Sequence, residues 1–394
     1  MSLAKMSTAK ADVFCSDLST VQKEMQSCVT PEYSRKKDGH WILWIDFCVS
    51  QAINPFLTGI QDPIPYLQVF AQRYRDGRIA PGKKAVRSRT VSDAIRSVGQ
   101  KFSRLGTPDP RFDSTGSVDF RLQSQFKSFE KADAPSCRVK PVPITLVLHA
   151  LEFAFHQYPT RERQAVANMI CLAFFFCLRP GEYTGTTRDD QAFAIADLTL
   201  FLGEKRLCNA TSPDAEILAA TAMHLTFTTQ KNGDKGTVVA HALSGHILCC
   251  PVRSAIRQLT VHRLEATSVP TPLCLSTKLA TYYNSNHVNV PVTASMVTAT
   301  MRCHATILRP QTGIDPLALS ARSLRAGGAM ALLQGKCDPI TIKLLARWHS
   351  DAMMRYLHQQ SVPIMKNLAS LMFNGGQYSF LPEEWVPSTP ISPD

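Results

Sequence analysis

The spacing of hydrophobic residues predicts helices along the first third of the chain. In Gly39–Cys48 apolar side chains recur every three or four residues, as they do on the core-facing side of a helix. The stretches Ile64–Tyr74 and Thr90–Leu105 repeat this spacing. We therefore expect a helical domain over residues 13–129, preceded by a flexible tail at residues 1–12.

A second domain is expected after a short linker. Residues 130–143 contain three prolines and mixed charge, which disfavours a helix and is typical of a linker. The second domain then covers residues 144–375, and a tail covers residues 376–394. Its apolar spacing predicts these helices: Leu146–Tyr158, Arg161–Leu178, Pro251–Leu264, Thr293–Leu308, Leu317–Gln334, Pro339–Ala346 and the segment that carries Tyr356.

A β-hairpin interrupts this helical pattern. Apolar and polar residues alternate on both sides of Asn232-Gly233 within Met223–Ala240, and Asn-Gly is a strong signal for a tight hairpin turn. The segment Pro270–Tyr283 suggests one more short strand. The predicted fold class is therefore mainly α with a small β-hairpin or sheet.

Charge narrows the range of partners. Lys and Arg outnumber Asp and Glu by 43 to 31 over 394 residues, giving a net charge of +12, which favours a polyanion such as nucleic acid. The excess concentrates in residues 73–104, where Asp76 and Asp93 are the only acidic residues. The candidate DNA-binding residues there are Arg73, Arg75, Lys83, Lys84, Arg87, Arg89, Arg96, Lys101 and Arg104.

Cysteines and apolar runs argue against two other classes of protein. The 12 cysteines contain no Cys-x-x-Cys pair and no second ligand pair at zinc spacing, so we expect reduced core thiols in an intracellular protein and no metal. The most apolar window, Ala165–Leu178, is interrupted by Asn168 and is too short to span a bilayer. No membrane association is expected.

The segment 322–358 holds side chains that suit chemistry on a phosphodiester. Arg322 and Arg325 are one helical turn apart and can bind a phosphate. Trp348 and His349 can donate hydrogen bonds, and Tyr356, eight and seven residues later, offers a hydroxyl nucleophile. Each residue alone also has a structural explanation, as a helix-capping arginine or a packed aromatic side chain, so the prediction rests on the combination.

With these motifs the chain resembles the tyrosine recombinase and integrase family, and among its members the recombinases of eukaryotic mobile elements. The resemblance covers about residues 144–375 and is strongest at the end of that range. It implies a two-domain, C-shaped clamp around double-stranded DNA, in which the first domain binds DNA and the second cuts one strand at a time. It also implies DNA recombination or integration as the function.

The family pattern implies roles for particular residues. The first arginine is Arg179, which precedes Glu182 by three residues, and the second is Arg325. The general acid that protonates the departing 5′ oxygen falls in the hairpin, on Lys231 or, as the alternative, on Lys235.

The remaining roles fall at the end of the domain. Trp348 fits the phosphate donor, with His349 as the alternative and Arg347 behind it. Tyr356 would form a 3′-phosphotyrosyl link, so that rejoining requires no ATP, metal or other cofactor.

One position departs from the family pattern. Arg322 stands where the family has a histidine, and an arginine cannot act as a general base near neutral pH. A recombinase-derived DNA-binding protein without catalysis is therefore the main alternative. A helical protein-interaction scaffold and a type IB topoisomerase are the other two.

Assembly and location follow from the resemblance alone. Family members act as tetramers on two synapsed sites, often passing a C-terminal helix to a neighbour, and Val362–Phe373 could be that helix. A mobile-element recombinase acts in the nucleus, which is the expected location.

Overall fold

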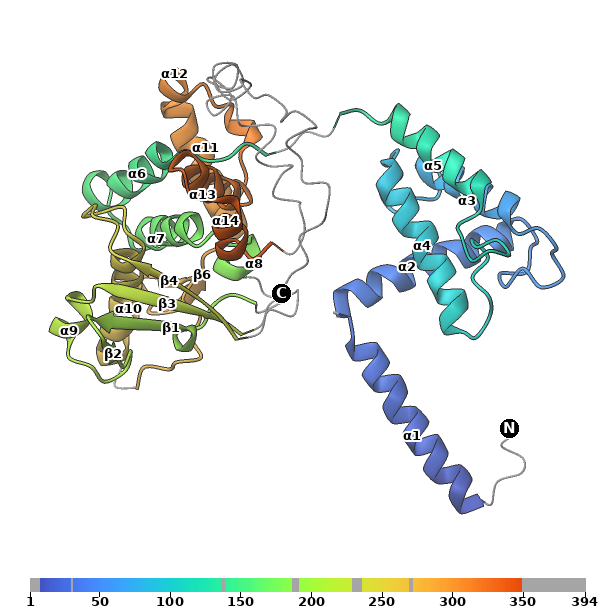
Figure 1. The fold of residues 1–394 in the computed structure, drawn as a ribbon, viewed down its shortest axis with the longest axis horizontal. Helices are drawn as coiled ribbons and strands as arrows, with labels where there is room; N and C mark the ends of the chain where they lie inside the picture. The colour runs from blue at the N-terminus through green and yellow to red at the C-terminus, as the bar shows by residue number, and fades with distance from the viewer. Residues whose placement is uncertain are drawn as a thin grey trace, which may run out of the picture. The chain divides into compact units, whose positions relative to one another are not determined.

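The computed structural model describes residues 8–29, 31–135, 139–185, 191–228, 236–268 and 272–348. The chain divides into two compact units, Met1–Ser136 and Cys137–Asp394. Figure 1 shows a first unit made of helices and a second that combines helices with a small sheet.

The first unit is helical around an aromatic core. Trp44, which is fully buried, meets Phe70 edge to face with ring centroids 5.3 Å apart. Val91 and Ile95 bury the apolar stripe predicted for α4, whereas Leu105 at its end is exposed. The helices are α1 (Thr8–Ser27), α2 (Pro31–Ser50), α3 (Ile64–Arg75), α4 (Ser88–Arg104) and α5 (Phe120–Ala132).

Both ends of this unit differ from the sequence expectation. α1 begins at Thr8, inside the stretch expected to be a flexible tail. α5 continues to Ala132, into the expected linker, because Asp133 just after it accepts hydrogen bonds from the Ser88 amide (2.9 Å) and hydroxyl (2.6 Å). Asp133 also forms an ion pair with Arg75. These contacts come from distant parts of the chain, which local composition does not report.

The second unit is built around α7 (Arg161–Phe175). All of its residues from Ala165 to Phe174 are buried, in agreement with the almost entirely apolar segment predicted there. The other helical elements are α6 (Ile144–Glu152), η2 (Phe153–Gln157), α8 (Pro180–Tyr183), η3 (Ile195–Asp197), α9 (Asp214–Leu218), α10 (Pro251–Ser268), α11 (Ala294–Ile307), α12 (Arg309–Thr312), η4 (Pro316–Ala318), α13 (Ser323–Gln334) and α14 (Pro339–Leu345).

The predicted hairpin belongs to a larger antiparallel sheet. β3 (Ala222–Phe227) pairs with β4 (Thr237–Ala242), and residues 229–235 of its turn lie outside the described part of the chain. The strands are ordered β2-β1-β3-β4, with β1 (Leu198–Leu202) and β2 (Lys205–Leu207) not anticipated from sequence. A separate hairpin joins β5 (Thr281–Tyr283) to β6 (Asn289–Pro291). The predicted class, mainly α with a small sheet, is confirmed.

Two helices expected to be continuous are interrupted. The one predicted for Leu146–Tyr158 changes to a π-helix at Phe153. The one predicted for Leu317–Gln334 breaks after η4, because the Ala321 carbonyl accepts from the Tyr183 hydroxyl (2.8 Å) and the Ala321 amide donates to Thr298 (3.0 Å). These bonds replace the helical pattern with tertiary contacts.

The cysteines only partly follow the expected core location. Among the described cysteines the buried ones are Cys48, Cys171, Cys177, Cys249 and Cys250, and the exposed ones are Cys15, Cys28, Cys208, Cys274 and Cys303.

Candidate functional site

The end of α7 directs Arg179 into the second unit's candidate site. The Leu178 amide donates to the Ala173 carbonyl (3.0 Å) and the Cys177 amide to the Phe174 carbonyl (3.3 Å), which is a Schellman motif. Cys177 occupies its left-handed position with φ of 48°, where glycine is usual. The chain then reverses into α8, and Arg179 is its N-terminal flanking residue.

Glu182 holds Arg179 in two ways. Its Oε2 accepts from the Arg179 backbone amide (2.8 Å), and its Oε1 accepts from Arg179 Nη1 (2.9 Å). The carboxylate is buried, whereas 29% of the Arg179 side chain is exposed. Glu182 therefore orients a guanidinium that solvent, and hence an anion, can reach.

The end of α14 has the same turn as the end of α7. The Trp348 amide donates to the Lys343 carbonyl (3.0 Å) and the Arg347 amide to the Leu344 carbonyl (3.0 Å), so that Arg347 is left-handed with φ of 55°. Two helices thus end in Schellman motifs whose left-handed residues are not glycine.

Arg325, on α13, binds both helix ends. Its Nη1 donates to the Cys177 carbonyl at 2.7 Å and its Nη2 to the Ala346 carbonyl. Guanidinium groups are well placed there, because the last carbonyls of a helix lack intrahelical partners and carry partial negative charge. Trp348 stacks against this group, with its ring centre 5.1 Å from Arg325 Cζ.

Arg347 also binds the ends of α7 and α14, and its side chain is buried. Its Nη1 donates to the Leu345 carbonyl (3.0 Å) and the Phe176 carbonyl (3.3 Å), and its Nη2 donates to Glu182 Oε2 (3.0 Å). Its Cζ lies 3.8 Å from the centre of the Phe227 ring on β3. For the donor role the sequence favoured Trp348, then His349, and Arg347 last.

The cluster carries more positive than negative charge. Three guanidinium groups, those of Arg179, Arg325 and Arg347, surround the single carboxylate of Glu182. Burial, and then repulsion from the other two arginines, lowers the pKa of Arg325 to about 10, so it is still charged at neutral pH. Burial also lowers the pKa of Arg347. Desolvated cations in excess favour an anionic ligand.

The other predicted catalytic residues fall into two groups. Arg322 is exposed at the start of α13, and none of its side-chain atoms bonds to another described residue. Lys231, Lys235, His349 and Tyr356 lie outside the described residues. The predicted site is thus represented by Arg179, Arg322, Arg325 and Trp348.

The predicted DNA-binding residues of the first unit also differ among themselves. Arg75 points inward: it pairs with Asp133 and donates to the Val86 carbonyl (2.7 Å). Asp38 pairs with Lys101 (3.0 Å) and Asp93 with Arg96 (3.3 Å). Asp38 and Asp133 come from outside residues 73–104. The excess of positive charge in this run is therefore smaller than its sequence suggested.

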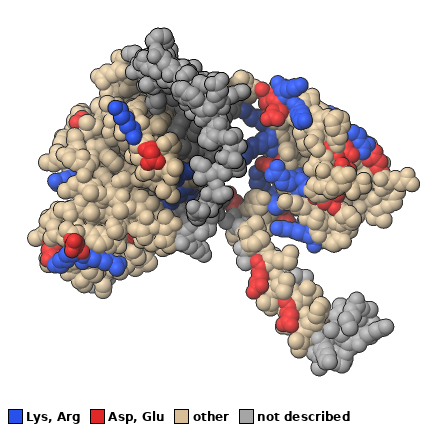
Figure 2. Space-filling model, in the orientation of Figure 1, with Lys and Arg blue, Asp and Glu red and all other residues tan. Residues whose placement is uncertain are grey.

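The remaining predicted DNA-binding residues of this run form no ion pair with a described residue. Arg73 donates to Gln51 (3.1 Å), and Arg87 donates to the Pro135 carbonyl (3.3 Å). Figure 2 shows lysine and arginine side chains over the surface of this unit, with carboxylates among them. Four of the run are exposed and form neither an ion pair nor a side-chain hydrogen bond with another described residue: Lys83, Lys84, Arg89 and Arg104.

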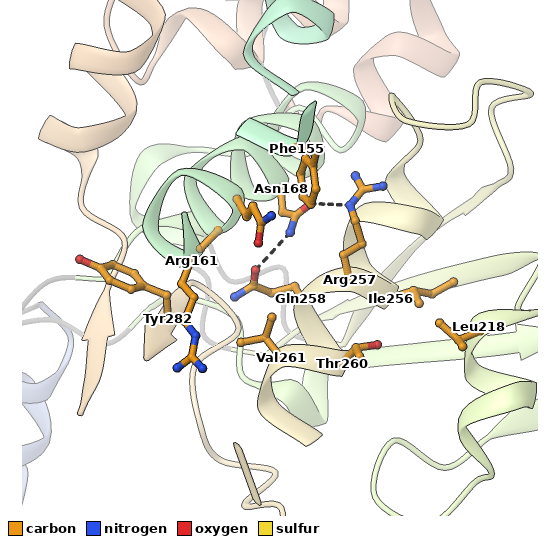
Figure 3. A pocket seen from close by; sticks show the side chains of 12 residues that line it. Phe155, Arg161, Asn168, Leu218, Ile256, Arg257, Gln258, Thr260, Val261 and Tyr282 are labelled. Atoms are coloured by element: carbon orange, nitrogen blue, oxygen red, sulfur yellow. Dashed lines mark hydrogen bonds between the residues drawn. The ribbon is translucent and has the colours of Figure 1, made fainter. Parts of the chain in front are cut away.

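A cavity of about 230 Å³ between α7 and α10 is a separate feature (Figure 3). Its polar side chains bond to one another: Arg257 donates to Asn168 (2.9 Å), Asn168 to Gln258 (3.4 Å) and Gln258 to the Thr281 carbonyl (2.5 Å). None of the clustered arginines lines it. This cavity therefore does not belong to the phosphate-binding candidate.

The described ranges provide neither a metal site nor a membrane-spanning helix. There, no three or more His, Cys, Asp or Glu side chains converge as metal ligands. None of the helices in that part of the chain has the length and apolar character needed to cross a bilayer.

Comparison with known proteins gives matches among solved structures only; no protein-family model and no curated protein matches the chain. The Tn1549 transposon integrase in complex with transposon right end DNA is 11% identical, with a TM-score of 0.44 over 79% of this chain and 84% of that one. The XerA recombinase is 11% identical, with a TM-score of 0.34 over 87% and 100%.

The XerH site-specific recombinase bound to difH substrate is 13% identical, with a TM-score of 0.38 over 80% of both chains. One fold serves many functions, and such matches assign none to this chain.

Proposed function

We propose that this chain is a site-specific DNA recombinase or integrase that cuts and rejoins duplex DNA through a 3′-phosphotyrosyl intermediate. The observation that carries the proposal is the arginine cluster. Arg179 and Arg325, 146 positions apart in sequence, meet in one group that has excess positive charge and is partly open to solvent. Such a group suits the phosphate of a DNA backbone.

In the proposed reaction the Tyr356 oxygen attacks phosphorus and the 5′ oxygen leaves. The ester bond between Tyr356 and phosphorus replaces the one that breaks, so the number of phosphoester bonds is unchanged. The phenol proton passes to water, and the leaving oxygen takes a proton from Lys231 or Lys235. Arg179 and Arg325 stabilise the additional negative charge of the pentacoordinate state. Trp348, against Arg325, supplies the indole donor, with His349 as its alternative.

The wider parts of the proposal follow from the resemblance. The two units would close as a clamp around duplex DNA, and the exposed residues Lys83, Lys84, Arg89 and Arg104 would contact its phosphates. Four copies would act on two synapsed sites. A nuclear location and an origin in a mobile element complete the proposal, and localisation of the tagged chain in eukaryotic cells tests the former.

A suicide-substrate experiment tests the chemistry. Duplexes selected from a random pool by binding to the full chain would be nicked beside the protected site, so that cleavage releases a short strand and traps the intermediate. We expect a covalent protein–DNA adduct that resists SDS and is lost in Tyr356→Phe, while DNA binding by that variant is retained. An adduct that persists in Tyr356→Phe would contradict the proposal.

The alternative is a DNA-binding protein that has lost catalysis. Arg322 in place of the family histidine favours it, because no general base then stands at that position to take the phenol proton. Tight, site-specific binding without an adduct would support this alternative. Relaxation of supercoiled DNA without a particular site would indicate a type IB topoisomerase. Weak binding to duplex DNA that does not depend on the basic residues of 73–104 would indicate an interaction scaffold.

A further inference from the structure

The Glu182 carboxylate is shared by two arginines that are far apart in the sequence, Arg179 and Arg347. Oε1 accepts one bond from Arg179 Nη1 (2.9 Å). Oε2 accepts from Arg347 Nη2 (3.0 Å) and from the Arg179 backbone amide (2.8 Å). Both oxygens are therefore engaged, and the Arg179 side chain holds only one of them.

This sharing matters because an arginine and a carboxylate prefer two parallel hydrogen bonds. Arg347 occupies the oxygen that Arg179 would need for such a pair. Among the described residues the Arg179 guanidinium makes no other hydrogen bond, so its Nη2 and Nε groups remain available. Arg179 is thereby oriented by Glu182 without being fully neutralised by it.

Arg347 itself is badly placed to bind an anion. Only 2% of its side chain is exposed, and its two terminal nitrogens are engaged with Glu182 and with backbone carbonyls. Contact with the Phe227 ring covers its guanidinium. These contacts support a role exerted through Glu182.

The arrangement also costs stability. Arg347 is left-handed at a position that usually takes glycine, and its Nε is buried without a hydrogen-bond partner among the described residues. The left-handed conformation lets the Arg347 side chain reach the Phe176 carbonyl at the end of α7. Local strain of this kind persists where the surrounding structure fixes a functional geometry.

We infer that Arg347 is a positioning residue: it holds Glu182 so that Arg179 presents free donors to an oxyanion, with the DNA phosphate as the ligand. The inference rests on the proposed function for the identity of that ligand. It gives Arg347 a task different from the donor role for which the sequence suggested Trp348, His349 or Arg347.

A double-mutant cycle on the full chain tests the inference, with inorganic sulfate as the probe and calorimetric titration as the readout. In Arg347→Met, Glu182 Oε2 keeps the Arg179 backbone amide and loses Arg347, so the Arg179 side chain can pair with the carboxylate through both oxygens. We expect sulfate affinity to fall by about tenfold or more, as for the loss of hydrogen bonds to a charged group. When Glu182→Gln is also present, no carboxylate competes, and Arg347→Met should cost only about two- to threefold, the effect of one nearby charge.

Equal losses in the presence and absence of Glu182→Gln would overturn the inference, because a direct ligand or a simple charge effect is independent of Glu182. So would the absence of any loss. Arg322→Met provides the matched control: it removes a cation that does not touch Glu182, so its effect should be the same with and without Glu182→Gln. If Arg347→Met does not fold, Arg347→Gln keeps a donor for the Phe176 carbonyl and enters the same cycle.

The experiment separates this inference from the proposed function. Coupling between Arg347 and Glu182 in a protein that forms no DNA adduct would leave the positioning role intact and remove the recombination chemistry. Failure of the unmodified chain to bind sulfate would remove the anion site, and both proposals with it.

Discussion

At the scale of single residues, two left-handed turns bring the arginines together. Cys177 and Arg347 each cost the chain about 1–2 kcal/mol relative to a right-handed residue. In return, the carbonyls of Phe176, Cys177, Leu345 and Ala346 become acceptors for Arg325 and Arg347. The two arginines thereby hold the end of α7 against the end of α14.

Because His304 is buried, we predict that the free energy of unfolding depends on pH. His304 is 2% exposed, and burial, with the nearby His149, lowers its pKa to about 4. Its Nδ1 lies 2.9 Å from that of His149, a contact that requires one nitrogen without a proton. Between pH 6.5 and 4 the unfolded chain therefore binds a proton that the folded chain does not, so the free energy of unfolding falls as pH falls.

His304 contributes about 1.4 kcal/mol per pH unit to the free energy of unfolding in this window. Above about pH 6.5 the contribution of His304 no longer changes with pH. We expect His304→Gln to reduce the pH dependence of the free energy of unfolding by about that amount, measured by urea unfolding at about pH 7, 6 and 5. A pH dependence equal to that of the unmodified chain would show that His304 does not resist protonation.

At the scale of elements, the site depends on how closely α13 approaches α7. A Cβ added at Gly328 would lie 2.0 Å from the Phe174 carbonyl oxygen and 2.9 Å from Cys177 Sγ. One at Gly327 would lie 2.3 Å from the Val142 carbonyl oxygen. The glycine pair thus lets the helix that carries Arg325 reach the end of α7.

Gly328→Ala should push these helices apart. We expect it to lower the free energy of unfolding by about 1–3 kcal/mol or more, the range for overpacking, and to weaken sulfate binding because Arg325 moves from the Cys177 carbonyl. Gly39→Ala in α2 is the control: its Cβ would meet nothing within 4 Å, so it should stabilise by about 0.5–1 kcal/mol. Denaturant unfolding and calorimetry measure both effects, and an unchanged stability in Gly328→Ala would contradict the close approach.

At the scale of the whole molecule, a net charge of +12 favours DNA, but the ion pairs decide which residues are available. Arg75 and Lys101 are paired with Asp133 and Asp38, whereas Lys83, Lys84, Arg89 and Arg104 are exposed without such partners in the described part of the chain. Phosphate contacts are expected from the second group.

Replacing those four residues by alanine should weaken DNA binding and its dependence on salt. Each phosphate contact contributes about 0.9 to the slope of log K against log salt, so we expect the slope to decrease by about three to four. Arg121→Ala is the control, because Arg121 already pairs with Asp62 (2.6 Å) and Asp119 (3.0 Å). Fluorescence anisotropy over a salt series measures both, and equal slopes in the quadruple variant and the unmodified chain would exclude these contacts.

The sequence by itself determined most of the helices, the strands of the hairpin and the candidate arginines. Apolar periodicity located α4 and α7 because burying one face of a helix requires that spacing, and Asn232-Gly233 marked a turn between two alternating strands. The Leu178–Glu182 run identified Arg179 and its carboxylate partner because both lie in one turn. Strand β1 was missed because the pairing that holds it in the sheet, with β3, is distant in sequence. Strand β2 has three residues and pairs, among the described strands, with β1 alone.

Only the tertiary structure decided which charges meet. Arg347 and Glu182 are 165 positions apart, and nothing local in either segment indicates that they share a buried hydrogen bond. Nothing local indicates that Arg75 pairs with Asp133 either. Arg75 was predicted to contact phosphate, and the structure shows it in an internal ion pair. Periodicity reports which face of an element is buried, whereas ion pairing depends on which elements pack together, a property of the whole chain.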